Sequence, residues 1–77
     1  MPASPLILYT GPNCSLCKKA EDLLYRIGIS EFDKIDVTSN LELKKRYGLK
    51  IPLLKRSDIE PELFWPFGEE DLVEYLS

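Results

Sequence analysis

Apolar residues along this chain change between the continuous run of a buried strand and the three-to-four spacing of a helix. Residues 6–10 are mostly apolar and end at Gly11 and Pro12, which predicts a strand covered on both faces. Residues 15–27 have helical spacing and stop at Gly28, a typical helix C-terminus. The apolar face of this helix is formed by Leu16, Ala20, Leu23, Leu24 and Ile27.

A second strand and a second helix follow. Residues 32–37 predict the strand, although the charged side chains of Asp33, Lys34 and Asp36 interrupt it. Ser39 and Glu42 have the spacing of a capping box. We therefore expect a helix that starts there and ends at Tyr47, with Gly48 as its stop and with Leu43 and Tyr47 on its inner side.

The C-terminal third predicts a hairpin and a last helix. Residues 51–54 and 62–65 are short apolar runs joined by a polar loop that includes residues 56–58, which suits an antiparallel pair. Acidic residues 69–71 suit a first helical turn, because the helix dipole favours negative charge there. The apolar face of this last helix is Leu72, Val73 and Leu76. The resulting order, β-α-β-α-β-β-α, predicts one α/β domain over residues 1–77, with a four-stranded mixed sheet and three helices.

Composition limits the classes of function. The 77 residues are 44% hydrophobic and 30% charged, with a net charge of −3. Basic side chains are dispersed among acidic ones, so we expect no nucleic-acid partner. No apolar run approaches the ~20 residues that cross a bilayer, and residues 1–5 lack the features of a signal peptide. We therefore expect a cytoplasmic monomer with no membrane partner.

The chain has two cysteines, Cys14 and Cys17, and no histidine. Where thiols are kept reduced, a Cys-x-x-Cys pair is typical of redox chemistry or of metal binding. Two thiols cannot supply the four ligands of a structural zinc site within one chain, so we expect no metal. Hydrolase mechanisms that depend on an imidazole are excluded as well.

Both cysteines fall at the predicted start of the first helix, with Asn13 or Cys14 near its N-cap. Unpaired N–H groups and the helix dipole stabilise a thiolate at this place. Cys17 lies one turn along and can resolve a mixed disulfide by intramolecular attack. We therefore expect Cys14 to be the nucleophile and Cys17 the resolving thiol. Lys18 either adds positive potential or is a solvated surface residue.

A family resemblance covers nearly the whole chain. Residues 8–17, which read Leu-Tyr-Thr-Gly-Pro-Asn-Cys-Ser-Leu-Cys, resemble the strand and active-site loop of glutaredoxins and thioredoxin-like proteins. Residues 47–54 and 63–67 match the late Ile-Pro and Trp-Pro-Phe elements of a small bacterial glutaredoxin-like family. The resemblance implies a thioredoxin fold with a redox-active Cys14–Cys17 pair.

The resemblance also implies a cis peptide bond before Pro52, with this proline facing the cysteines. The residues alone leave a trans proline at the start of an edge strand equally open, because proline lacks a ladder donor and cis bonds are uncommon. A cis bond would expose backbone groups of Ile51 to an extended thiol substrate. The implied substrate-binding residues are Ser15, Leu16, Ile51 and Pro52, and the supporting residues are Pro12, Asn13 and Lys18.

The sequence departs from glutathione-using glutaredoxins at several positions. Residues 15–16 replace Pro-Tyr, residues 50–52 replace Thr-Val-Pro, and Phe67 replaces the first glycine of a Gly-Gly turn. Glu69 and Glu70 would oppose a glutathione carboxylate. We therefore expect no bound cofactor and a protein or low-molecular-weight thiol or disulfide as partner, with glutathione only as an alternative co-substrate.

Three functions stay open from the sequence. The first is a thiol-disulfide oxidoreductase, which the position of Cys17 favours. The second is a binding module that holds a metal or an iron-sulfur cluster, with two Cys-x-x-Cys pairs across a dimer. The third is a non-catalytic interaction domain with structural cysteines. Of Phe64, Trp65 and Phe67 we expect at least two in the core, and an exposed Trp65 would instead suit a partner surface.

Overall fold

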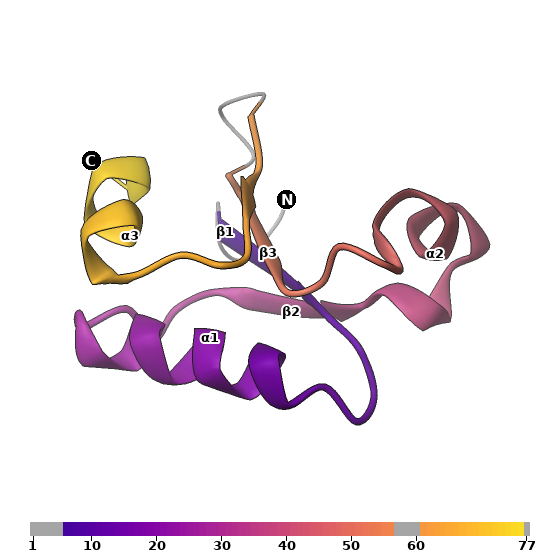
Figure 1. Cartoon of the computed structure of the whole chain (residues 1–77), viewed down its shortest axis with the longest axis horizontal. Coiled ribbons are helices and arrows are strands. Elements are labelled where there is room, and N and C mark those ends of the chain that lie inside the picture. The colour runs from indigo at the N-terminus through magenta and orange to yellow at the C-terminus, as the bar shows by residue number, and fades with distance from the viewer. Residues whose placement is uncertain (1–5, 57–60, 77) are drawn as a thin grey trace.

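A four-stranded sheet with helices on both faces forms the domain in the computed structural model, which describes residues 6–56 and 61–76 (Figure 1). The strands are β1 (Leu6–Thr10), β2 (Asp33–Asp36), β3 (Leu53–Arg56) and β4 (Leu63–Phe64). The helices are α1 (Ser15–Arg26), α2 (Leu41–Tyr47) and α3 (Glu69–Leu76), with the short 3-10 helix η1 (Val37–Ser39) between β2 and α2. This order confirms the predicted succession of elements. None of these helices is long and apolar enough to span a membrane.

The strands lie in the order β2-β1-β3-β4. β1 and β2 are parallel and are joined through α1, whereas β3 is antiparallel to both of its neighbours. An ion pair of 3.0 Å from Lys34 on β2 to Glu21 on α1 ties the crossover to the sheet, and this hydrogen-bonded partner raises the pKa of Lys34. The predicted hairpin is present, and residues 57–60 of its loop lie outside the described residues.

Side chains that alternate along β1 and β3 build a core on each face of the sheet. Leu8 and Leu54 point to the face covered by α1 and α3, where they pack with Ala20, Leu24, Phe67 and Leu72. Tyr9 and Leu53 point to the opposite face, where they pack with Val37 and Tyr47 of η1 and α2. This period-two alternation is the strand geometry that lets one short strand serve two cores. Figure 1 shows α1 and α3 on one side of the strands and α2 on the other.

The two ends of α1 lie where the sequence predicts them. Cys14 is the N-cap, with extended backbone angles. At the other end Gly28 has φ +88°, a left-handed conformation that glycine adopts without steric cost. The N–H of Ile29 then donates to the carbonyl of Leu24 at 2.9 Å, which closes the helix.

The predicted capping box at Ser39 and Glu42 is wrong. Asn40 is the N-cap of α2, and its Oδ1 accepts from the N–H groups of Glu42 and Leu43 at 2.9 and 3.2 Å. Ser39 belongs to η1, where its hydroxyl donates to the carbonyl of Asp36. The Asp36 carboxylate accepts from the hydroxyl and the N–H of Thr38, and these bonds lower the pKa of Asp36.

Asn40→Ala is expected to destabilise the protein by about 0.5–2 kcal/mol, because two N–H groups of α2 lose their acceptor. Ser39→Ala serves as the matched control and should cost less, since the hydroxyl of Ser39 caps no N–H of α2. Urea unfolding midpoints of the two variants give the comparison. A larger loss of stability in Ser39→Ala than in Asn40→Ala would show that Ser39, and not Asn40, caps α2.

Val73 also differs from the prediction, because it is 57% exposed. α3 is eight residues long and buries Leu72, while Tyr75 and Leu76 pack partly against the same core. One position beyond Leu72 lies about 100° around a helix with 3.6 residues per turn, so Val73 faces outward. The short helix has room for one buried stripe only.

Candidate functional site

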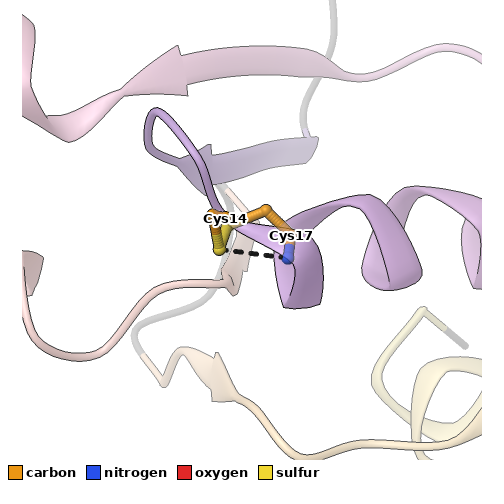
Figure 2. The surroundings of a disulfide bond; sticks show 2 residues. All are labelled: Cys14 and Cys17. Atoms are coloured by element: carbon orange, nitrogen blue, oxygen red, sulfur yellow. Dashed lines mark hydrogen bonds between the residues drawn. A yellow bond between two sulfur atoms is a disulfide. The ribbon is translucent and has the colours of Figure 1, made fainter.

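A disulfide joins Cys14 and Cys17 across the first turn of α1, with their Cα atoms 5.2 Å apart (Figure 2). The N–H of Cys17 donates to the Sγ of Cys14 at 3.1 Å, drawn as the dashed line in Figure 2. This N–H is one of the four at a helix start that have no partner inside the helix. The sulfur of Cys14 therefore acts as the helix cap, in a place where backbone dipoles favour negative charge.

The two sulfur-bearing residues differ in exposure. Cys17 is 2% exposed and shares a buried stripe with Ala20 and Leu24. Cys14 is only partly buried. A reagent in solution therefore reaches Cys14 first, whereas Cys17 is shielded by the core face of α1.

Leu16 does not belong to the apolar face of α1, contrary to the prediction. It is 40% exposed, because Cys17, Ala20 and Leu24 occupy the stripe that meets the sheet. Ser15 and Lys18 are exposed on the same turn. Leu16 therefore lies at the surface between the two cysteines and presents an exposed apolar side chain near Cys14.

The loop from β1 to α1 brings a second segment to the cysteines. In this loop Pro12 and Asn13 are exposed, and Asn13 has φ 55°, a left-handed conformation that asparagine tolerates better than most residues. A Cβ on Gly11 would lie 2.6 Å from the Cδ1 of Ile51. Gly11 thus lets Ile51 pack directly against the loop, and the Ile51–Pro52 peptide bond is cis, as the resemblance implies.

Trp65 connects the Pro52 segment to the end of the sheet. Its backbone N–H donates to the carbonyl of Pro52 at 3.2 Å. Its ring meets the ring of Phe67 edge-on, with the two centroids 5.0 Å apart. Phe67 is buried, Trp65 is partly buried against the core, and Phe64 is 40% exposed, so two of the three aromatic residues serve the core as predicted. The bond between Trp65 and Pro52 continues the predicted pairing of β3 with β4, whereas the second cis bond, at Pro66, has no signal in the sequence pattern.

Tyr47 supports the site from the opposite face of the sheet. The centroid of its ring lies 4.9 Å from that of Tyr9, and Ile51 packs against the core cluster that contains both tyrosines. Its hydroxyl donates to Oε2 of Glu62 at 2.9 Å. Burial, followed by this hydrogen bond, raises the pKa of Tyr47, so the phenol stays protonated and acts as a structural link.

Metal ligands at the site are limited to the two thiols. The chain contains no histidine, and within residues 6–56 and 61–76 no three His, Cys, Asp or Glu side chains gather in a metal-binding arrangement. One copy of the chain thus offers two sulfur ligands at this place. Reaching four would need a second copy.

Comparisons with known proteins agree with this geometry. A family model described as a glutaredoxin-like domain matches residues 5–77. The Gene 56 protein of Mycobacterium phage L5 is 31% identical over 80 residues, which cover 96% of this chain and 77% of that protein.

Solved structures give the same picture. The X-ray structure of a structural-genomics target protein from X. campestris superposes with a TM-score of 0.84 at 31% identity, covering 92% of this chain and 93% of that one. A glutaredoxin from Archaeoglobus fulgidus has a TM-score of 0.65 at 23% identity, covering 95% and 86% of the two chains. The second likeness concerns the fold alone, and it confirms the predicted thioredoxin fold.

Proposed function

Because this chain belongs to the glutaredoxin-like domain family, we propose that it is a thiol-disulfide oxidoreductase that works through Cys14 and Cys17. The observation that carries the proposal is the asymmetry of the pair. Cys14 is accessible and its sulfur accepts an N–H from the helix start, while Cys17 is buried one turn along. Exchange needs an exposed sulfur stabilised as thiolate and a second sulfur within reach, and this turn supplies both.

The reaction balances with these two side chains. In the reduced protein the Cys14 thiolate attacks one sulfur of a substrate disulfide, whose S–S bond breaks and releases the first substrate thiolate. The Cys17 thiolate then attacks the Cys14 sulfur, forms the internal disulfide and releases the second substrate thiolate. The substrate gains two electrons, and the two cysteine protons reach its thiols through solvent. A thiol or dithiol donor runs the same steps backwards and restores the reduced pair.

The N–H of Cys17 has a defined task in each step. It donates to the Cys14 sulfur in the disulfide form, and it is a helix-start donor within the same turn that can serve this sulfur when it becomes a thiolate. A hydrogen bond to a charged acceptor is stronger than one to a neutral sulfur, so the contact favours the reduced, ionised Cys14. The same stabilisation makes Cys14 the better leaving group when a mixed disulfide is attacked at the substrate sulfur.

The proposal extends to the surroundings of the pair. Ser15, Leu16 and Ile51 are assigned to the substrate-contacting surface, which accepts a protein or a low-molecular-weight thiol or disulfide. Pro52 is fully buried, so its ring offers no surface to a substrate and its assigned part is to position the backbone of Ile51. Gly11 supports this assignment, because it brings Ile51 against the loop that leads into Cys14. Both reacting sulfurs come from one chain, so the chemistry requires only a monomer, and we place it in the cytoplasm.

Equilibration with glutathione redox buffers tests the proposal. We expect a reversible two-electron transition between roughly −270 and −120 mV, the range of thioredoxin-like exchangers. Alkylation of free thiols, read by mass spectrometry, follows the Cys14–Cys17 pair directly. Protein alkylated before the titration is the control for buffer effects. If no internal disulfide forms at any buffer ratio, the dithiol mechanism fails and metal content becomes the next measurement.

A further inference from the structure

We propose that a trough beside the cysteines docks an extended, acidic segment of the protein whose disulfide exchanges with Cys14. The trough consists of two hollows that share Trp65 as a lining residue, and it is called the Trp65 trough below. The smaller hollow, about 320 Å³, is lined by Leu49, Lys50, Phe64 and Trp65. The larger, about 770 Å³, is lined by Lys19, Asp22, Leu23, Tyr25, Arg26 and Trp65. The inference rests on the proposed function and specifies its substrate class.

Covalent and hydrogen-bonded links place the trough next to the site. Lys50 directly precedes Ile51, which packs against the loop leading to Cys14. The backbone N–H of Trp65 donates to the carbonyl of Pro52. Lys19 lies two positions after Cys17 on α1. A chain bonded through its cysteine to Cys14 can therefore continue along this surface.

The smaller hollow presents apolar surface that the described part of the chain leaves uncovered. Leu49 is fully exposed and Phe64 is 40% exposed. Single exposed apolar residues are ordinary, but here a leucine and two aromatic side chains line one concavity. An apolar side chain of a partner would remove this surface from water, at roughly 25 cal/mol per Å² buried.

Charge selects an acidic partner. Within residues 6–56 and 61–76, the lining of the trough has three cations, Lys19, Arg26 and Lys50, against one carboxylate, Asp22. Lys50 lies over the ring of Phe64, with its Nζ 5.6 Å from the centroid, which holds the ammonium at the rim of the smaller hollow. The chain as a whole has a net charge of −3, so this local excess of positive charge opposes the overall balance.

One contact competes with a ligand. Arg26 lies 3.8 Å from Glu69, and their side chains are 70% and 51% exposed. An exposed pair at this distance is weak and screened by salt, so it does not prevent Arg26 from binding another carboxylate. Among the described residues that line its hollow, Lys50 has no carboxylate beside it, and it is therefore the decisive cation.

The size of the trough favours a polypeptide over a small thiol. An extended chain advances about 3.3 Å per residue, so a segment of several residues is long enough to contact both hollows. Because the hollows share Trp65, a single segment could contact Lys50 and then Lys19. The partner is thus a protein disulfide flanked by carboxylates, with an apolar side chain nearby.

The test separates docking from redox chemistry. The probe is a synthetic peptide with aspartates around a central serine in place of cysteine, and the comparison peptide has lysines instead. Trp65 is the single tryptophan of the chain, so its fluorescence reports binding directly. We expect saturable binding of the acidic peptide, at least about fivefold tighter than that of the basic one, a preference that weakens with added salt. Lys50→Glu should reduce the affinity for the acidic peptide roughly fivefold, on the scale of exposed charge pairs.

Lys45→Glu is the matched control, because it makes the same charge change at an exposed position of α2. It should leave peptide affinity unchanged. Equal affinity for both peptides, or an equal effect of the two substitutions, would overturn the trough as an acidic docking surface. Glutathione binding as tightly as the acidic peptide would overturn the assignment to a polypeptide.

Reduction of a small neutral disulfide, hydroxyethyl disulfide, is measured in parallel. We expect Lys45→Glu to retain the wild-type rate with this substrate, because its position on α2 lies outside the trough. Failure of the wild-type protein to reduce it would remove the proposed function, while charge-selective peptide binding would still support the trough. Normal reduction without charge-selective peptide binding would support the proposed function and overturn the trough as a docking surface.

Discussion

Cys14→Ser is expected to abolish disulfide exchange, whereas Cys17→Ser is expected to accumulate a mixed disulfide on Cys14. Serine at position 14 removes the accessible sulfur that the helix start stabilises. We expect the rate to fall roughly a thousandfold or more, as when a nucleophile is removed from a covalent mechanism. Serine at position 17 leaves the first attack intact and removes the second, so the adduct persists.

Mass spectrometry after incubation with a cysteine-containing peptide disulfide locates the adduct. The double variant, with serine at both positions, is the control for non-specific labelling. Our assignment of roles requires that the adduct of Cys17→Ser forms readily, and that Cys14→Ser acquires little, because Cys17 is 2% exposed. An adduct on Cys17 that forms as fast as one on Cys14 would reverse the roles of the two sulfurs.

The site was accessible to sequence reasoning because its parts are local. A continuous apolar run, a Gly-Pro turn and a Cys-x-x-Cys pair at the start of a helical pattern lie within residues 6–17, and each has a short-range cause. The element order followed in the same way from changes in period. The N-cap position of Cys14 and the stop at Gly28 depend on backbone groups a few residues away, which the sequence displays directly.

The errors have physical causes as well. Before α2, three residues have side chains that can cap a helix: Asp36, Ser39 and Asn40. In η1 the Asp36 carboxylate already accepts from Thr38, and the Ser39 hydroxyl already donates to the Asp36 carbonyl, which leaves Asn40 to cap α2. Propensity alone cannot rank such neighbours. Val73 was misplaced because apolar residues on a short helix do not all fit the stripe that meets the sheet.

Contacts between distant residues were the hardest to foresee. The N–H of Trp65 meets the carbonyl of Pro52, and Ile51 meets Gly11 across forty positions of sequence. The first bond continues the register of the β3–β4 hairpin, in which Leu53 pairs with Phe64. The second contact follows from no period or motif, because it depends on how the segment before β3 packs beside the β1–α1 loop. Such contacts bring the Cys14 turn, the Pro52 segment and Trp65 to one end of the fold.

Leu24→Ala is expected to destabilise the protein by about 2–5 kcal/mol, since it deletes a fully buried side chain and leaves a cavity between α1 and the sheet. A domain of this size has a total stability on the order of 4–12 kcal/mol, so the loss is a large part of it. Leu41→Ala, at a position 68% exposed, is the matched control and should change stability little. Urea unfolding of both variants in the disulfide form gives the comparison. A difference under about 1 kcal/mol would show that α1 is not held to the sheet by this face.

The same substitution tests how the fold maintains the asymmetry of the cysteines. Leu24 lies seven positions after Cys17 on one face of α1, and packing of that face keeps Cys17 buried while Cys14 stays accessible. Loosening it should raise the alkylation rate of reduced Cys17 more than that of Cys14, at urea concentrations well below the unfolding midpoint. Equal acceleration at both thiols would show that the first turn of α1 protects Cys17 by itself. Unequal acceleration would show that the division between attacking and resolving sulfur is imposed by the hydrophobic core.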